Sequence, residues 1–314
     1  MAALPGFLWK ANVIFTVLFA AYYLLLRKEK FLVFNRFLLA GIFLLALTLP
    51  LCPNLVPAGI DPGHILKAPV TRFYTFFETS IYPDRTIITN RLESTDLSMV
   101  ATAVYLLVIT FLLIKLLFQV LKILGIVSKS KRSVMQGMVY CEPIQELPPF
   151  SFFRYIVISG QTLNPEQYRY ILTHELCHCR QLHSIDVLLT ELARILFWFN
   201  PLVYVYRDQV KLNLEFLADE QVIRGGADRK AYQLSLLSLA TGKPLFNMTN
   251  AFYSSKIKRR ISMMNIGLGS GSRYKYAVIA PLILISYMLI NWEPIMSMAR
   301  NQILIPCHNK HCEI

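Results

Sequence analysis

The histidines at positions 174 and 178 flank a glutamate in the pattern H-E-x-x-H. On a helix, His174 and His178 lie one turn apart on the same face, so their neutral imidazoles can bind one metal ion. Glu175 lies beside them, where a carboxylate can accept a proton from a metal-bound water. The motif therefore predicts a catalytic zinc helix, with the two histidines as ligands and Glu175 as general base.

Such a site needs a third protein ligand and an open position for water. In LNLEFLADEQV, residues 212–222, Glu215 and Asp219 lie four positions apart in an apolar frame, so both carboxylates should face the core. Buried carboxylates are costly unless they bind a cation or hydrogen-bond donors. We expect Glu215 to be the third ligand of one Zn²⁺ and Asp219 to hydrogen-bond a ligand histidine and fix its tautomer. The alternative is a solvated face shared with Glu220.

Other side chains around the motif allow more than one interpretation. Cys177 and Cys179 could form a thiolate cage, but within this turn they point to other faces of the helix. We expect them to be buried small side chains in a reducing compartment. Asp186 either supports the site as a second-shell group or belongs to the first turn of the next helix, and His183 is equally open.

Local signals place the motif on a helix. Asn164, Pro165 and Gln167 form a helix start, so a helix should begin at 164–165 and run through the motif. The preceding segment FFRYIVISG, residues 152–160, predicts a strand whose part 152–158 could pair with an extended substrate. A proline at Ile156 should then reduce turnover.

A second apolar helix should run from about Ser184 to Phe199 and stop at Asn200-Pro201. Glu191 and Arg194 lie within it, which favours a buried or membrane-grazing helix over a fifth span.

The composition indicates a membrane protein, because 55% of the residues are hydrophobic and only 16% are charged. Spans need about 20 apolar residues. Four stretches approach this length, at about 7–26, 37–51, 99–124 and 276–290.

Basic residues at 27–30, after the third span and before the fourth indicate that these ends face the cytoplasm. Both termini and the proline-containing loop 52–97 would then be external, in a bacterial cell membrane.

The net charge of +13 could suggest a nucleic-acid partner. No recognisable nucleic-acid module accompanies it, so we attribute it to topology and to attraction by the anionic inner leaflet, with the lipid bilayer as partner and no direct nucleic-acid contact.

These features predict a mainly α integral membrane protein with about four transmembrane helices and a cytosolic α+β zinc metallopeptidase domain. The expected parts are residues 1–124 with three spans, the peptidase domain at 125–275, and a fourth span with a short external Cys/His tail at 276–314. A homodimer is compatible with this plan.

The ordered segments THELCHCRQLHSIDVL, WFNPLVYVY, NLEFLADE and RRISMM resemble the BlaR/MecR-type integral-membrane zinc metallopeptidases. The resemblance covers roughly residues 1–295. It implies a gluzincin-like domain that cleaves itself and then a cytosolic transcriptional repressor or its relay when an external signal arrives. Position by position, His174, His178 and Glu215 match the zinc ligands, Glu175 the general base and Asp219 the second-shell aspartate.

The C-terminal part differs from the antibiotic-sensing members of this family. About 24 residues follow the last span in place of a penicillin-binding sensor domain, so we do not expect β-lactam sensing. The tail carries Cys307, His308, His311 and Cys312, which could form a disulfide, a metal or redox sensing patch, or an incidental group.

Two other functions fit the same sequence. A housekeeping protease that degrades damaged membrane proteins would be active without a signal. A non-catalytic transducer with a structural zinc would signal normally after Glu175→Ala, because the metal ligands remain.

Overall fold

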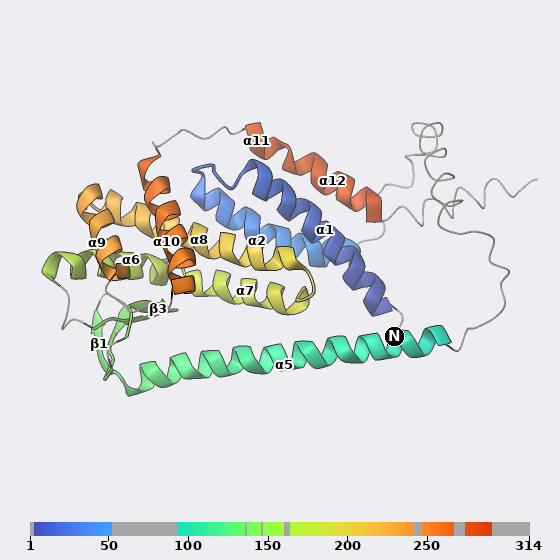
Figure 1. Cartoon of the computed structure of the whole chain (residues 1–314), viewed down its shortest axis with the longest axis horizontal. Coiled ribbons are helices and arrows are strands. Elements are labelled where there is room, and N and C mark those ends of the chain that lie inside the picture. Colours follow the sequence, from blue (N-terminus) through green and yellow to red (C-terminus); the bar gives the residue numbers. More distant parts are fainter. Residues whose placement is uncertain are drawn as a thin grey trace, which may run out of the picture.

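The computed structural model describes residues 3–51, 93–135, 137–145, 147–159, 164–241, 247–266 and 274–290. Most of the described residues are helical, with one small sheet (Figure 1). Most of the predicted external loop 52–97 and all of the tail 291–314, with its cysteines and histidines, lie outside the described residues.

Three helices are long and apolar enough to cross a membrane. They are α1 (Ala3–Leu25), α2 (Leu32–Thr48, continued by the short 3₁₀ helix η1, Leu49–Leu51) and α5 (Glu93–Lys129). They coincide with the first three predicted spans. The fourth predicted span overlaps α11 (Tyr274–Ala277) and contains α12 (Ile279–Ile290), in an apolar segment shorter than the first three.

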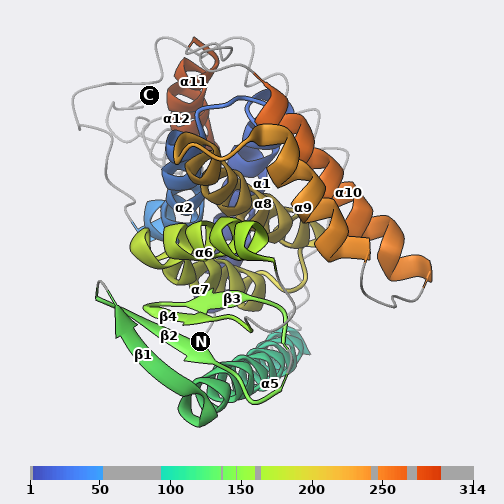
Figure 2. The ribbon, with the colours of Figure 1, turned by 90° about the vertical axis from the view of Figure 1, so that its left-hand side faces the viewer.

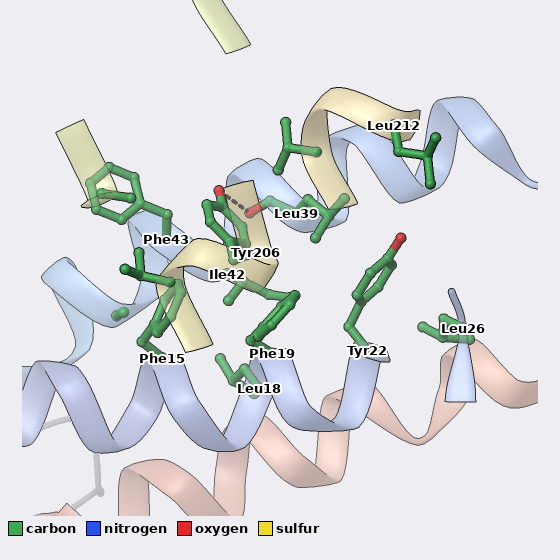
Figure 3. Close-up of a cluster of buried hydrophobic side chains, with 14 of the residues drawn as sticks. Phe15, Leu18, Phe19, Tyr22, Leu26, Leu39, Ile42, Phe43, Tyr206 and Leu212 are labelled. Carbon is green, nitrogen blue, oxygen red and sulfur yellow. Dashed lines mark hydrogen bonds between the residues drawn. The ribbon is translucent and has the colours of Figure 1, made fainter. Parts of the chain in front are cut away.

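The spans α1 and α2 pack against α8 (Pro201–Arg224), a helix of the peptidase block, the name used here for residues 131–266. Figure 3 shows Phe15 and Phe19 of α1, Phe43 of α2 and Tyr206 of α8 in one apolar cluster. Tyr206 Oη donates a hydrogen bond to the Leu39 carbonyl at 3.1 Å. The first half of α8 is therefore fixed against the membrane helices.

The sheet has four short strands in the order β1-β2-β4-β3. These are β1 (Lys131–Met135), β2 (Met138–Glu142), β3 (Phe150–Phe152) and β4 (Tyr155–Val157). The pair β2–β4 is parallel, and the other two pairs are antiparallel.

The prediction of a single strand at 152–160 is wrong. Phe153 adopts φ 51°, and its N–H donates to Ser184 Oγ at 2.8 Å, so the chain reverses here into two strands. Ile156 pairs with Tyr140 on one side and Ser151 on the other. The strand β4 is therefore internal, and a proline at Ile156 would break the sheet itself. The edge strands of this sheet are β1 and β3.

Five helices complete the block: α6 (Pro165–Arg180), α7 (His183–Leu196), α8, α9 (Arg229–Thr241) and α10 (Asn247–Asn265). The predicted start of α6 is confirmed, because the Asn164 side chain accepts a hydrogen bond from Gln167 N. Figure 2 shows α6 between the sheet on one side and α8 on the other.

The helix α7 has 14 residues, which is short for a span, and Asn200 then caps α8.

Candidate metal centre

Two antiparallel-packed helices bring together the three predicted metal ligands. His174 and His178 lie one turn apart on α6, and Glu215 faces them from α8. One ligand atom from each residue lies within 4.8 Å of the others. His174 Nε2 lies 3.2 Å from His178 Nε2 and 3.3 Å from Glu215 Oε2, and His178 Nε2 lies 3.6 Å from Glu215 Oε1.

These separations fit a tetrahedral ion. Zinc bonds of about 2.05 Å to nitrogen and oxygen imply ligand–ligand distances of roughly 3.3 Å. The two Nε2 atoms lie 3.2 Å apart, and they lie 3.3 Å (His174) and 3.6 Å (His178) from the two different oxygens of Glu215, so all three distances are close to this value. Two imidazole nitrogens and one carboxylate are also a donor set that zinc favours, and they leave a fourth position for water or substrate. The residues therefore fit a catalytic zinc ion.

Glu175 lies next to the ligands on α6 and is buried. Burial raises the pKa of its carboxyl group, and the neighbouring His174 and a hydrogen bond with Ser151 of β3 only partly oppose this. A raised carboxyl pKa makes the conjugate base a better proton acceptor near neutral pH. Glu175 thus has the environment expected of a general base.

Asp219 lies behind His174, on the side away from the other ligands. Its Oδ1 is 3.3 Å from His174 Nδ1, and it also accepts hydrogen bonds from Tyr232 Oη at 2.7 Å and from Arg260. Burial opposes ionisation of Asp219, but Arg260 outweighs it and lowers the pKa. The aspartate therefore stays charged and can hold a proton on His174 Nδ1, leaving Nε2 for a cation.

His174 lies between the two carboxylates of α8, which determine its pKa. Burial alone would lower its pKa, but hydrogen bonds with Asp219 and Glu215 raise it to about 9. The carboxylates thus attract positive charge to this point, and a divalent cation would replace the second proton of the imidazole. Burial likewise opposes the charged form of Glu215, yet His174 and Arg260 hold its pKa far below the usual range.

His178 and His183 behave differently from His174. Burial and the proximity of His174 lower the pKa of His178 to about 4, and burial and the proximity of His178 lower that of His183 to about 3. Both imidazoles are neutral at pH 7, the form in which a histidine binds metal. The two Nδ1 atoms lie 2.7 Å apart.

Asp186, expected either as a second-shell group or as part of the next helix, lies in the first turn of α7. Its carboxylate forms a two-point ion pair with Arg36 of α2, with a shortest distance of 2.7 Å. The Asp186 carboxylate therefore pairs with a cation of α2, outside the predicted ligand set.

The cysteines of the motif are buried free thiols, as expected. Cys177 and Cys179 are almost inaccessible to solvent. Burial raises their pKa values to about 11 and about 12, so both are protonated at neutral pH. A thiolate cage is therefore disfavoured.

Sequence reasoning missed two residues of the site, Tyr232 on α9 and Arg260 on α10. Arg260 Nη1 lies 2.9 Å from Glu215 Oε2 and its other nitrogens bind Asp219, so one guanidinium holds both carboxylates of α8. Arg260 lies in RRISMM, a segment that carried the family resemblance without a chemical role. Tyr232 has no local sequence signal.

Comparisons with known proteins agree with this geometry. Residues 151–264 match the family model described as BlaR1 peptidase M56. The methicillin resistance mecR1 protein of Staphylococcus aureus is 24% identical over 144 residues, which cover 44% of this chain and 25% of that protein. The regulatory protein BlaR1 of Bacillus licheniformis is 28% identical over 111 residues, covering 35% of this chain and 16% of that protein.

The match to these curated relatives spans a quarter of their length or less. The family model covers the H-E-x-x-H helix and the α8 carboxylates. Apolar helices of spanning length precede this part, which agrees with a membrane protein. Residues 151–264 therefore form a peptidase M56 segment of the BlaR/MecR type.

Proposed function

We propose that this protein is a membrane-embedded zinc metalloendopeptidase that transmits an external signal by proteolysis. The observation that carries the proposal is the closeness of the three donor groups. The Nε2 atoms of His174 and His178 lie 3.2 Å apart, and they lie 3.3 and 3.6 Å from Oε2 and Oε1 of Glu215, distances close to the edge of a tetrahedral zinc site. Glu175 is buried and lies on α6, the helix that carries both histidines.

The protein's own groups support peptide hydrolysis at this point. Bound zinc would supply Lewis acidity and an acidified water. Glu175 would accept the proton of that water and later deliver it to the leaving amine, a role that suits its raised pKa. Asp219 and Arg260 would keep His174 and Glu215 in ligating geometry.

Substrate binding involves β3 rather than β4 in this proposal. The strand β3 packs against α6, and its Ser151 side chain contacts Glu175. Within the described part of the chain, β3 pairs only with β4, so its other edge can accept an extended peptide. A peptide in that position would run beside the general base.

The biological setting is proposed from the family and from the charge pattern. The peptidase segment would face the cytoplasm of a bacterial cell, where basic residues flank the spans. Its substrates would be the chain itself and a cytosolic regulator such as a transcriptional repressor. The names of the matched relatives, a regulatory protein and a methicillin resistance protein, support a signalling role.

The test compares the wild type with Glu175→Gln in the same bacterial membrane. We expect Glu175-dependent fragments of the chain and loss of one or a few cytosolic proteins, detected by immunoblot and mass spectrometry. Both proteins should contain one zinc, because Glu175 is not a ligand, whereas His178→Ala should lose it.

The other candidate functions give different results in the same experiment. Glu175-dependent degradation of many membrane proteins without any signal would indicate housekeeping proteolysis. Normal signalling by Glu175→Gln, with zinc bound and no fragments, would indicate a non-catalytic transducer and refute the proposal.

A further inference from the structure

We propose that His183 is a positioning residue that fixes the tautomer of His178, and that Gln181 and Arg36 set the direction of this hydrogen bond. The four residues form a chain of contacts, here called the imidazole relay, which runs from span α2 to a metal ligand. The inference rests on the proposed function, because it assigns His178 Nε2 to the metal.

The imidazole relay is continuous in the structure. Arg36 Nη1 lies 3.4 Å from Gln181 Oε1, which lies 3.1 Å from His183 Nε2. His183 Nδ1 then lies 2.7 Å from His178 Nδ1. His178 Nε2 is the atom that faces His174 and Glu215. The relay thus starts on a membrane helix and ends at the metal centre.

The direction of each hydrogen bond in the imidazole relay follows from Arg36, its first residue. An arginine side chain carries only donors, so the Gln181 atom that faces Arg36 must be the amide oxygen. That oxygen can only accept, so His183 Nε2 must carry a proton and donate it to Gln181. In a neutral imidazole the other nitrogen, Nδ1, is then a lone-pair acceptor.

The remaining step fixes the metal ligand. Because His183 Nδ1 accepts, His178 Nδ1 must donate, and the lone pair of His178 is placed on Nε2. This is the tautomer that binds zinc through Nε2. A metal-binding histidine usually donates its second N–H to a carboxylate or a carbonyl. Here a neutral histidine takes that place, while Asp219 serves the other ligand, His174.

The backbone between α6 and α7 holds His183 in position. Leu182 adopts φ 52° and ψ 40°, a left-handed conformation that leucine rarely adopts. The turn places the first residue of α7 against the last turn of α6, and His183 is 1% exposed. Such a turn persists only when surrounding contacts stabilise it, and the bond between the two imidazoles is one such contact.

Arg36 connects the imidazole relay firmly to the membrane. Besides Gln181 Oε1, it donates to the Gln181 backbone carbonyl at 2.7 Å and to both oxygens of Asp186. A displacement of α2 relative to the α6–α7 turn would therefore reorient the Gln181 amide. Through these contacts, a movement of α2 would change the affinity of the metal centre for its ion.

The experiment measures metal affinity and ligand-field spectra of the full-length protein in detergent, using competition with a chelator for Zn²⁺ and absorption of the Co²⁺ form. His183→Leu removes the acceptor and should weaken binding by about 10- to 100-fold. The Co²⁺ absorption should also change, because the orientation of His178 is no longer fixed. Buried native cysteines should stay protected from a thiol reagent, which shows that the variant is folded.

Two conservative replacements provide matched rescues. In His183→Asn, the amide oxygen can occupy the place of Nδ1, so most of the lost affinity should return. Gln181→Glu keeps an acceptor for His183 and should bind metal as well as the wild type, whereas Gln181→Met should bind more weakly. Gln167→Met, a change at the far end of α6, is the control and should leave binding unchanged.

Arg36 is tested in two backgrounds. Arg36→Met should weaken metal binding in the wild type but have no further effect in His183→Leu, because the relay is already interrupted there. Additive losses would overturn the relay, as would wild-type affinity and an unchanged Co²⁺ spectrum in His183→Leu. If the wild type binds no metal, or His178→Ala binds it normally, the proposed function itself fails.

Discussion

The Asn200 side chain at the turn between α7 and α8 provides a sharp test of how the peptidase block is attached to the membrane helices. Its Oδ1 accepts from Leu202 N at 2.8 Å and so caps α8. Its Nδ2 donates to Asn12 Oδ1 at 2.7 Å and to Thr16 Oγ1 at 3.0 Å, both on α1. The side chain is buried, so Asn200→Ala removes three interactions that water does not replace.

The expected cost can be added from these interactions. Loss of an N-cap costs about 1 kcal/mol. Hydrogen bonds between helices in a membrane contribute about 0.6 kcal/mol each, and up to roughly 1.7 kcal/mol. Asn200→Ala should therefore lower stability by about 2–3 kcal/mol. Asn200→Ser keeps a capping oxygen and should lose about 1 kcal/mol less.

The assay uses cysteines that are already present. Cys141, Cys177 and Cys179 are buried free thiols, so a thiol-reactive dye reports unfolding after accessible thiols have been blocked. Each kcal/mol should shift the thermal midpoint by about 2–4 °C for a chain of this size. A double-mutant cycle with Asn12→Ala should give a coupling energy of about 1 kcal/mol, because the two side chains share a bond.

Additive effects of Asn200→Ala and Asn12→Ala would refute the contact between this turn and α1. An equal loss in Asn200→Ser and Asn200→Ala would show that the cap contributes nothing. The first outcome would mean that the α7–α8 turn is not fixed against the span, and the second that α8 does not depend on this cap.

Three further perturbations follow from the described contacts. Burial opposes ionisation of Glu191, but hydrogen bonds from three cations lower its pKa from 4.5 to about 2. The three cations are Arg207, Lys211 and Arg194. Because the folded-state pKa is depressed, ionised Glu191 should contribute up to about 3 kcal/mol to the free energy of unfolding above pH 4.5, and this contribution should be lost as the pH falls toward 2. The thermal midpoint of Glu191→Gln should therefore change less over that pH range than the midpoint of the wild type. Arg260→Met leaves the buried Asp219 carboxylate and the partly exposed Glu215 carboxylate without their cation, and should lower the free energy of unfolding by about 3 kcal/mol. This loss should shrink when excess zinc supplies positive charge, and equal losses in thermal melts with and without zinc would contradict this. Gly226 has φ 87°, so Gly226→Ala should lower the melting midpoint by the equivalent of about 1 kcal/mol, and an unchanged midpoint would show that the turn relaxes.

Much of the local structure could be predicted because its causes are local. Asn164 and Pro165 set the start of α6, and long apolar runs set the three spanning helices. The spacing of His174 and His178 places both imidazoles on one face of any helix, whatever surrounds it. The strand prediction failed at Phe153, because its turn depends on a bond to Ser184, which lies 31 residues further along the chain.

The sequence by itself predicted the candidate ligands and the candidate base and the helix face on which each lies, since both follow from residue type and helical periodicity. Only the tertiary structure decided what lies next to each ligand. Arg260 reaches Glu215 and Asp219 from α10, and His183 orients toward His178 through a left-handed turn. Such contacts depend on how separate helices pack in three dimensions, and no short-range pattern in the chain encodes the distance between them.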